Sequence, residues 1–297
     1  MELITGENDK GRRLDRILRK ALPEYPLPLI HRLLRQGLVL VNGKPAGAQE
    51  RLEPGVTIDI PSLSGAQKSA SSSALALPSP EVIWQGNGLI AVNKPSGLEV
   101  HGHNSLDTIV GAYLADKISV SLSFKSGPLH RLDKPTSGIV IFSTNIEGAR
   151  LFSSLLKEHK VRKTYLAIVE GTVKNEEIWQ DELVRDKEMK KTFISKNDAG
   201  GKAALTKITP LASKDKYSLI KAEIATGRTH QIRTQAASRG FPLAGDRKYG
   251  SRAREFAKSG FFLHAWKIEF LNVSIEAKAP KAFIKKTEEL SLFQNLF

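Results

Sequence analysis

A run of small polar residues, alanine and proline over residues 63–80 divides the sequence into two unequal parts. Such a composition is typical of a flexible linker, because it offers too little apolar surface for a packed core. A chain of 297 residues can hold one large and one small domain around this linker. We therefore expect a small domain over residues 1–62 and a large domain over residues 81–297, and the linker would allow the small domain to swing.

The first 62 residues are expected to form a compact α+β domain. Its first helix is indicated by apolar residues at helical spacing, which are Leu14, Ile17, Leu18 and Ala21. A second helix is predicted over residues 29–36 and would end at Gly37. Strands are predicted over residues 38–41 and 56–60, and Asn42-Gly43 is typical of a hairpin turn.

The large domain combines strands and helices without a regular strand–helix–strand repeat. Strands are predicted over residues 82–84, 89–93, 139–142, 165–169, 217–224 and 261–270. Ser105 and Asn145 each precede an apolar pattern with helical spacing and are predicted N-caps. This mixture predicts an α+β fold around a large mixed, mainly antiparallel sheet with flanking helices.

The net charge of +14 and a pI near 9.8 indicate a partner with many negative charges. Nucleic acid is favoured over an anionic membrane surface, because no long basic amphipathic helix is evident. Neither a membrane-spanning segment nor a signal peptide is expected, since no long uninterrupted apolar run occurs. The absence of cysteine excludes disulfides and thiolate metal sites, and it favours a reducing cytoplasm.

Three short segments carry candidate functional side chains. Over residues 130–140, Asp133 lies just ahead of a turn and an apolar strand, which is either an ordinary turn position or a place for chemistry. Over residues 226–237, Arg233 would lie near a helix start, where its guanidinium can pair with a carboxylate. Tyr165 opens an apolar strand and is either a core residue or a flat face on which a base stacks.

Several other chemistries are disfavoured by missing motifs. His101 and His103 would lie on alternating sides of an extended segment, and no HExxH or cysteine spacing occurs, so no catalytic metal is expected. The sequence also lacks a phosphate-binding glycine loop and a GxSxG elbow. Phosphoryl transfer, dinucleotide binding and serine hydrolase chemistry are therefore not expected.

Taken together, the motifs resemble the pseudouridine synthase family, in the branch that modifies uridines in ribosomal or transfer RNA. Five blocks occur in the family's order, over residues 93–97, 130–138, 163–171, 227–233 and 263–265. They are similar to the opening strand–turn, the catalytic loop, the tyrosine strand, the arginine motif and the late leucine motif of the family. The likeness extends from about residue 81 to residue 297 and implies the pseudouridine synthase fold.

The resemblance implies an isomerisation, in which the N1–C1′ bond of a uridine breaks, the uracil turns and C5 joins C1′. Asp133 would be the catalytic carboxylate, either as a nucleophile at C1′ or as a base for a sugar proton, with Arg233 as its partner. Tyr165 would stack on the uracil and assist proton removal from C5. The uridine would be flipped out of the RNA, and Arg131 would fill the vacated place. Further substrate contacts are expected from His130, Thr136, Arg228, His230 and Leu263.

Residues 11–60 resemble the S4 RNA-binding module that often accompanies this family. The expected RNA contacts are basic residues of the two predicted helices, namely Arg12, Arg13, Arg16, Arg32 and Arg35. The sequence departs from the module at Leu27-Pro28-Leu29, where a serine and basic residues are usual. RNA is therefore the expected partner of both domains, and the protein is expected to act as a monomer without cofactor or metal.

Two other functions are compatible with parts of the sequence. A noncatalytic RNA-binding or ribosome-assembly factor would use the S4-like module, but it would have no need for Asp133, Tyr165 and Arg233 together. A carboxylate-dependent glycosidase would need a second catalytic carboxylate, and no clear candidate pairs with Asp133. The expected substrate is large-subunit ribosomal RNA, with transfer RNA as the alternative.

Overall fold

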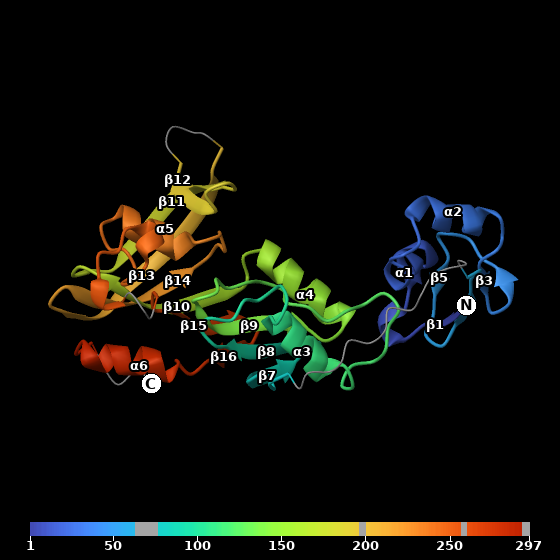
Figure 1. Ribbon diagram of the computed structural model, residues 1–297, viewed down its shortest axis with the longest axis horizontal. Helices are drawn as coiled ribbons and strands as arrows, with labels where there is room; N and C mark the ends of the chain where they lie inside the picture. The colour runs from blue at the N-terminus through green and yellow to red at the C-terminus, as the bar shows by residue number, and fades with distance from the viewer. Residues whose placement is uncertain (63–76, 196–199, 257–259, 293–297) are drawn as a thin grey trace.

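Two folded units make up the computed structural model, which describes residues 1–62, 77–195, 200–256 and 260–292. Figure 1 shows a small N-terminal unit at one end and a large sheet with flanking helices over the rest of the molecule. The predicted α+β class with a large, mainly antiparallel sheet is confirmed. Most of the predicted linker, residues 63–76, lies outside the described residues. No helix in the described part of the chain is long and apolar enough to span a membrane.

The N-terminal unit packs two helices against short strands. Helix α1 spans Leu14–Ala21 and helix α2 spans Leu27–Arg35, and their apolar residues share one core. The strands are β1 (Glu2–Ile4), β2 (Arg12–Arg13), β3 (Leu40–Val41), β4 (Lys44–Pro45), β5 (Arg51–Leu52) and β6 (Thr57–Asp59). Asn42 and Gly43 have φ values of 48° and 76° between β3 and β4, which confirms the predicted hairpin turn.

The large sheet has ten strands and one parallel pairing, between β15 and β9. The strands are β7 (Val82–Gly86), β8 (Leu89–Lys94), β9 (Ser137–Ser143), β10 (Arg162–Glu170), β11 (Glu177–Asp186), β12 (Lys191–Ile194), β13 (Lys202–Lys214), β14 (Tyr217–Ile224), β15 (Leu263–Phe270) and β16 (Val273–Glu276). Their order is β12-β11-β13-β14-β10-β15-β9-β8-β7, with β16 paired to β15. The central strands read as continuous apolar runs because both of their faces are buried.

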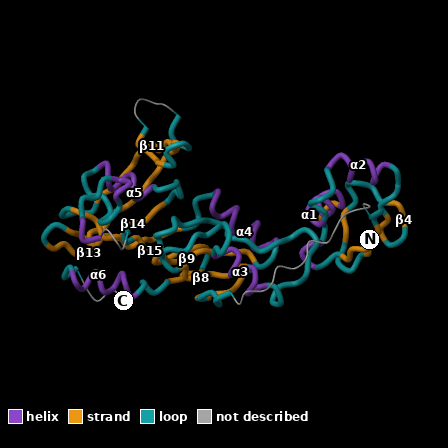
Figure 2. The backbone as a smooth tube through the Cα atoms, viewed as in Figure 1, coloured by secondary structure: helices purple, strands orange, loops and turns teal. Residues whose placement is uncertain are grey.

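Helices cover both faces of this sheet. On one face, apolar residues of α3 (Leu106–Leu114) and α5 (Gln231–Ser238) share a core with one side of β10. On the other face, α4 (Ile146–Lys157) packs on β8 and β9, and α6 (Lys281–Glu289) packs on β10 and β14. Both predicted N-caps are confirmed, because the Ser105 and Asn145 side chains accept hydrogen bonds from the amides of Thr108 and Gly148. Figure 2 shows how the loops connect these layers.

The N-terminal unit is docked onto a loop of the large unit. Asp9 is buried and accepts hydrogen bonds from Ser121 Oγ at 2.8 Å, from the Leu122 amide at 2.9 Å and from the Ser123 amide at 3.0 Å. Leu122 packs against the core of the N-terminal unit. A Cβ atom on Gly6 would lie 1.8 Å from the Val120 carbonyl oxygen, so only glycine permits this approach. These contacts join the N-terminal unit to the large unit in this structure.

Candidate active site

Hydrogen bonds within the loop and from a neighbouring turn fix the loop that carries Asp133. Within the loop, the Asp133 carbonyl accepts a hydrogen bond from the Thr136 amide at 3.0 Å. The turn after β8 braces it, because the Gly97 amide and the buried Lys94 ammonium both donate to the Lys134 carbonyl, at 2.8 and 3.2 Å. Burial lowers the pKa of Lys94 to about 8, although the charge of Asp133 opposes the shift. The carboxylate is therefore presented by a rigid loop.

At the other end of the loop, Gly138 pairs with Ala265 in the parallel contact between β9 and β15. It has a φ value of 108°, and a Cβ atom there would lie 2.2 Å from the Ala265 carbonyl oxygen. Only glycine satisfies both conditions, the left-handed backbone and the close approach. The strand pairing that follows Asp133 thus depends on this residue.

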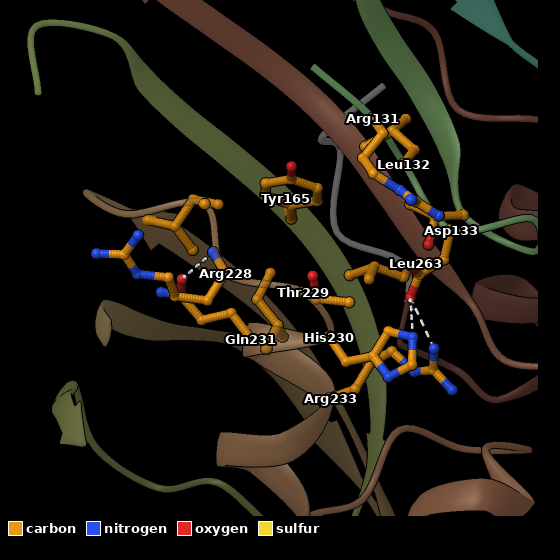
Figure 3. A pocket seen from close by; sticks show the side chains of 14 residues that line it. Arg131, Leu132, Asp133, Tyr165, Arg228, Thr229, His230, Gln231, Arg233 and Leu263 are labelled. Carbon is orange, nitrogen blue, oxygen red and sulfur yellow. Dashed lines mark hydrogen bonds and ion pairs between the residues drawn. The ribbon is translucent and has the colours of Figure 1, made fainter. Parts of the chain in front are cut away.

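The Asp133 side chain lines a pocket of about 130 Å³, which lies on the sheet face covered by α5. Figure 3 shows the side chains that line it. The lining residues are Arg131, Leu132, Asp133, Thr136, Tyr165, Ile224, Gly227, Arg228, Thr229, His230, Gln231, Ile232, Arg233 and Leu263. The pocket therefore combines the loop of Asp133, β10, the start of β15 and the start of α5, which are far apart in the sequence.

Asp133 and Arg233 form the central ion pair of this pocket. Nη1 of Arg233 donates to Oδ2 of Asp133 at 2.7 Å, and the two side chains are 7% and 19% exposed, in the order arginine and aspartate. Burial lowers the pKa of Arg233, but hydrogen bonds and charges from Asp246 and Asp133 outweigh it and raise the pKa above the ordinary arginine value. The arginine is thus a permanent cation against the Asp133 carboxylate.

Arg233 is held by a second carboxylate that sequence analysis did not select. Asp246 is 2% exposed and accepts from Nε of Arg233 at 2.7 Å and from Nη2 at 3.0 Å. The guanidinium also lies 4.9 Å from the Tyr249 ring centroid and 4.4 Å from that of Phe261. Residues 242–250 follow the segment of Arg233 closely in the sequence, but nothing in them marks a partner for Asp246.

His230 lies beside the ion pair as a neutral imidazole. Its Nε2 is 3.6 Å from Oδ2 of Asp133, and its Nδ1 is 2.7 Å from the Tyr249 hydroxyl and 3.3 Å from Nη1 of Arg185. Burial lowers the pKa of His230 to about 4, with Arg233 and Arg185 acting in the same direction and Asp133 against it. Because Arg185 can only donate, Nδ1 accepts and Nε2 carries the proton that faces Asp133.

Tyr165 and Leu263 form the apolar side of the pocket. Both side chains are buried and belong to the core that β10 shares with α5. Burial raises the pKa of Tyr165 well above its usual value, and the charge of Asp133 adds to the shift. The ring is therefore a neutral phenol at physiological pH. Together, the two side chains can hold a flat, apolar ring next to the carboxylate.

Most of the predicted site residues meet in this pocket, and His130 does not. His130 Nε2 accepts a hydrogen bond from the Ile141 amide at 3.1 Å, and its ring stacks on Phe152. Burial, aided by the charge of Lys163, lowers the pKa of His130 far below its usual value. These contacts are structural, and His130 does not line the pocket. The others line the pocket, namely Asp133, Tyr165, Arg233, Arg131, Thr136, Arg228, His230 and Leu263.

Three of the lining residues have polar groups that are free to bind a ligand. The Thr136 hydroxyl is buried and has no hydrogen-bond partner in the described residues. Arg228 donates from Nε to the Ala203 carbonyl at 3.0 Å, and Arg131 is exposed. These groups can bind a polar molecule that enters the pocket. Across the described residues, no group of three or more His, Cys, Asp and Glu side chains could hold a metal ion.

The basic residues predicted for the N-terminal unit have different surroundings. Arg12 donates to the Ser123 carbonyl at 3.0 Å, within the contact between the two units. Arg13 pairs with Asp15 at 2.7 Å. Arg16, Arg32 and Arg35 are exposed and remain accessible to a polyanion. Three of the five predicted residues therefore have the exposure that an RNA contact needs.

Known proteins resemble both units of the chain. A model of the RNA pseudouridylate synthase family matches residues 88–238, and a model of the S4 domain matches residues 12–58. A ribosomal large subunit pseudouridine synthase C from Vibrio cholerae is 30% identical over 92% of this chain and 89% of its own. A ribosomal large subunit pseudouridine synthase D from Neisseria meningitidis is 30% identical over 91% of this chain and 76% of its own.

A solved structure shares the fold of the large unit. Human RNA pseudouridylate synthase domain containing 4 superposes with a TM-score of 0.61 at 21% identity, over 72% of this chain and 94% of its own. The predicted resemblance is therefore confirmed. The chain belongs to the RNA pseudouridylate synthase family, whose members are isomerases that act on uridines in RNA, and it carries an S4 domain at its N-terminal end.

Proposed function

We propose that this protein isomerises specific uridines of structured RNA to pseudouridine, with Asp133 as the catalytic carboxylate. One observation carries the proposal: the Asp133 carboxylate shares a pocket with the Tyr165 ring and accepts a 2.7 Å hydrogen bond from Arg233. A carboxylate, a flat aromatic surface and a fixed cation are the groups that cleavage of a base from its sugar requires here.

Asp133 acts on the ribose of the bound uridine. It either forms a bond to C1′ as N1 leaves or removes a sugar proton, and both steps separate the uracil from the sugar. The uracil turns within the pocket and C5 bonds to C1′. In the first route the Asp133–C1′ bond breaks as the new bond forms, and in the second route Asp133 returns the proton to the sugar. The proton on C5 is then lost while N1 gains one. Product and substrate are isomers, so no oxidant, water or cofactor is consumed. Arg233 supports the carboxylate as its counter-ion in a half-buried site.

Tyr165 binds the uracil through its ring face. Because its pKa is raised, Tyr165 has almost no phenolate form at neutral pH. It is therefore not ionised in advance to act as a general base for the C5 proton. We therefore assign stacking to Tyr165, with Leu263 on the same wall of the pocket. The unpartnered Thr136 hydroxyl supports a hydrogen bond to the nucleotide.

The target uridine must leave the RNA stack to enter this pocket, because the lining side chains enclose only a small space. Arg131 is exposed at the pocket and is the proposed side chain that fills the vacated place. The S4 domain would hold the flanking RNA through Arg16, Arg32 and Arg35. The names of the relatives favour large-subunit ribosomal RNA as the substrate, with transfer RNA as the alternative.

The remaining parts of the proposal concern organisation. We divide the chain into an S4 domain over residues 1–62, a linker over residues 63–80 and a catalytic domain over residues 81–297, in line with the matched regions 12–58 and 88–238. The pocket is built from residues of one chain, which supports action as a monomer. We place the activity in the cytoplasm, where the proposed substrate is made and assembled.

The proposal is tested by tritium release from large-subunit ribosomal RNA that carries tritium at C5 of its uridines. The wild-type protein should release tritium at specific positions, and Asp133→Asn should release none above background. A matched control is Asp107→Asn on α3, whose carboxylate is half-exposed and outside the pocket, and it should behave as the wild type. Thermal melting of all three proteins checks that each is folded.

The outcomes separate the enzyme from a noncatalytic RNA-binding factor. Turnover by Asp133→Asn would remove Asp133 from its proposed role. Tight RNA binding by the wild type without any tritium release, on either ribosomal or transfer RNA, would favour the binding factor. Mapping of pseudouridines in total cellular RNA with and without the gene would then identify the modified positions.

A further inference from the structure

Lys163 lies on the pocket face of β10, although it is not one of the residues selected from the sequence. It is two residues before Tyr165 on the same strand, and its partner across β14 is Ile224, which lines the pocket. Side chains two residues apart on a strand, and side chains directly opposite on neighbouring strands, point to the same face. The Lys163 ammonium would lie 3.7 Å from a Cβ atom on Gly227, another lining residue. It therefore lies at the edge of the pocket.

This ammonium has no anionic partner in the described residues. Burial alone lowers the pKa of Lys163 to about 8, and no carboxylate charge acts against the shift. Its neighbour His130 is uncharged and already accepts a hydrogen bond from a backbone amide. A half-buried cation without an anion is unfavourable unless water or a ligand compensates it. The fold thus maintains a positive charge here that an incoming anion can satisfy.

Apart from Asp133, the charged residues that line the pocket are all cations. Its single acidic lining residue is Asp133, which is already paired with Arg233. Arg131 and Arg228 also line the pocket, and neither has a carboxylate partner among the described residues. An RNA strand that delivers one base to the pocket must bring its phosphates past these cations. Lysine suits this task, because its ammonium is a compact point charge that binds phosphate from any direction.

We infer that Lys163 binds the RNA backbone phosphate next to the uridine that stacks on Tyr165. The two side chains are separated by about 7 Å along β10, since a strand rises about 3.3 Å per residue. This distance allows the base to lie on the ring while the adjoining phosphate reaches the ammonium. The inference rests on the proposed function, and it adds the residue that fixes the phosphate of the flipped nucleotide.

The test uses the full-length protein with Asp133→Asn, which binds without turnover, and an in vitro transcript of large-subunit ribosomal RNA. The dissociation constant is measured by filter binding over a range of KCl concentrations for that protein and for the same protein with Lys163→Met. Loss of one phosphate contact should weaken binding several-fold and make the slope of log K against log salt shallower by about 0.7 to 0.9. Lys163→Arg should restore both the affinity and the slope.

Lys221→Met is the matched control. Lys221 is on β14 and faces the opposite side of the sheet, where it pairs with Glu223 at 3.0 Å. The substitution removes the same charge and should leave the affinity and slope unchanged. If Lys163→Met behaves like Lys221→Met, the inference is overturned. Thermal melting shows that each variant is folded, and the salt slope reports phosphate contacts rather than stability.

A second measurement locates the phosphate. Short uridine-containing RNAs carry one neutral methylphosphonate linkage, placed either 5′ or 3′ to the central uridine. The neutral linkage at the contact should weaken binding to the Lys163 protein and have no effect on binding to the Lys163→Met protein. Equal losses for both proteins at both linkages would overturn the inference. Tritium release by the wild type is scored separately, so a failure of this contact is distinguishable from a failure of the proposed function.

Discussion

Arg233 and Asp246 form a two-nitrogen contact that fixes the direction in which the arginine meets the Asp133 carboxylate. Nε and Nη2 of the guanidinium donate to the Asp246 carboxylate at 2.7 and 3.0 Å, which leaves Nη1 for Asp133. The rings of Tyr249 and Phe261 lie on the guanidinium and restrict its movement. Asp246 does not line the pocket, so it is a positioning residue that acts through Arg233.

Asp246→Asn should lower kcat by about tenfold to a hundredfold and leave KM within a few-fold, because small displacements of a catalytic group cost about this much. The substitution removes one of the carboxylate oxygens that accept from Arg233, so Nη1 is no longer held toward Asp133. Single-turnover tritium release and initial-rate kinetics on ribosomal RNA measure the two constants.

Asp181→Asn is a matched control for this prediction. Asp181 pairs at 2.9 Å with Arg239, which directly follows the helix of Arg233 and lies away from the pocket. The Asp181→Asn substitution therefore removes a comparable carboxylate–guanidinium pair, but kcat should stay near the wild-type value. Equal losses of kcat in both variants would show that the effect of Asp246 is structural, and an unchanged kcat in Asp246→Asn would contradict its positioning role.

Gly138→Ala should destabilise the protein by about 3 kcal/mol or more, since a left-handed backbone and a clash with the Ala265 carbonyl would act together. The clash lies in the parallel contact of β9 with β15, directly after the loop of Asp133, so activity should fall as well. Urea unfolding measures the stability. Gly111→Ala, in α3 with no atom near the new methyl, should be neutral or stabilising, and a similar loss there would contradict the argument.

The sequence was sufficient for the class of fold and for most of the pocket. The order of five motifs identified the loop of Asp133, the strand of Tyr165 and the helix of Arg233, and local signals such as Ser105 and Asn145 placed helix starts correctly. Each of these signals depends on residues close in the chain. The order of the motifs matches that of the family, and this match predicts that the three side chains come together in the fold.

Other features could not be predicted, because they depend on long-range packing. His130 is next to the catalytic loop in sequence, but its ring points into the core against Phe152 and not into the pocket. Strands β11, β12 and β13 were not predicted, since their outer faces carry charged residues and exposed apolar residues such as Ile178. Asp246 and Arg233 are separated in the sequence by a loop, so the spacing of apolar residues along a helix or strand does not predict their ion pair.

His264 should make the stability of the protein depend on pH. It is fully buried between the Ser137 hydroxyl and the Ala277 carbonyl, and burial lowers its pKa to about 4. The unfolded state, with an ordinary histidine pKa near 6.5, binds more protons between pH 4 and 6.5, so the free energy of unfolding falls as the pH drops through this range. The contribution is about 1.4 kcal/mol per pH unit.

Comparison of the wild type with His264→Gln isolates this contribution from other titrating groups. The variant should be less stable at pH 7, where the neutral histidine keeps both contacts, and the difference should shrink by about 1 to 2 kcal/mol on going to pH 5. Urea unfolding at several pH values measures it. A difference that stays constant with pH would mean that His264 does not remain neutral in the folded protein.

Asp9→Ala should loosen the contact between the N-terminal unit and the large unit. The substitution leaves the amides of Leu122 and Ser123 without their acceptor, at a cost on the order of 3 kcal/mol for such buried donors. Hydrogen exchange at these two amides should become faster, while amides in β10 keep their protection. Asp15→Ala removes a carboxylate that pairs with Arg13 within the N-terminal unit, so hydrogen exchange at Leu122 and Ser123 should stay at the wild-type rate. Unchanged exchange at Leu122 and Ser123 in Asp9→Ala would show that the two units are held by other contacts.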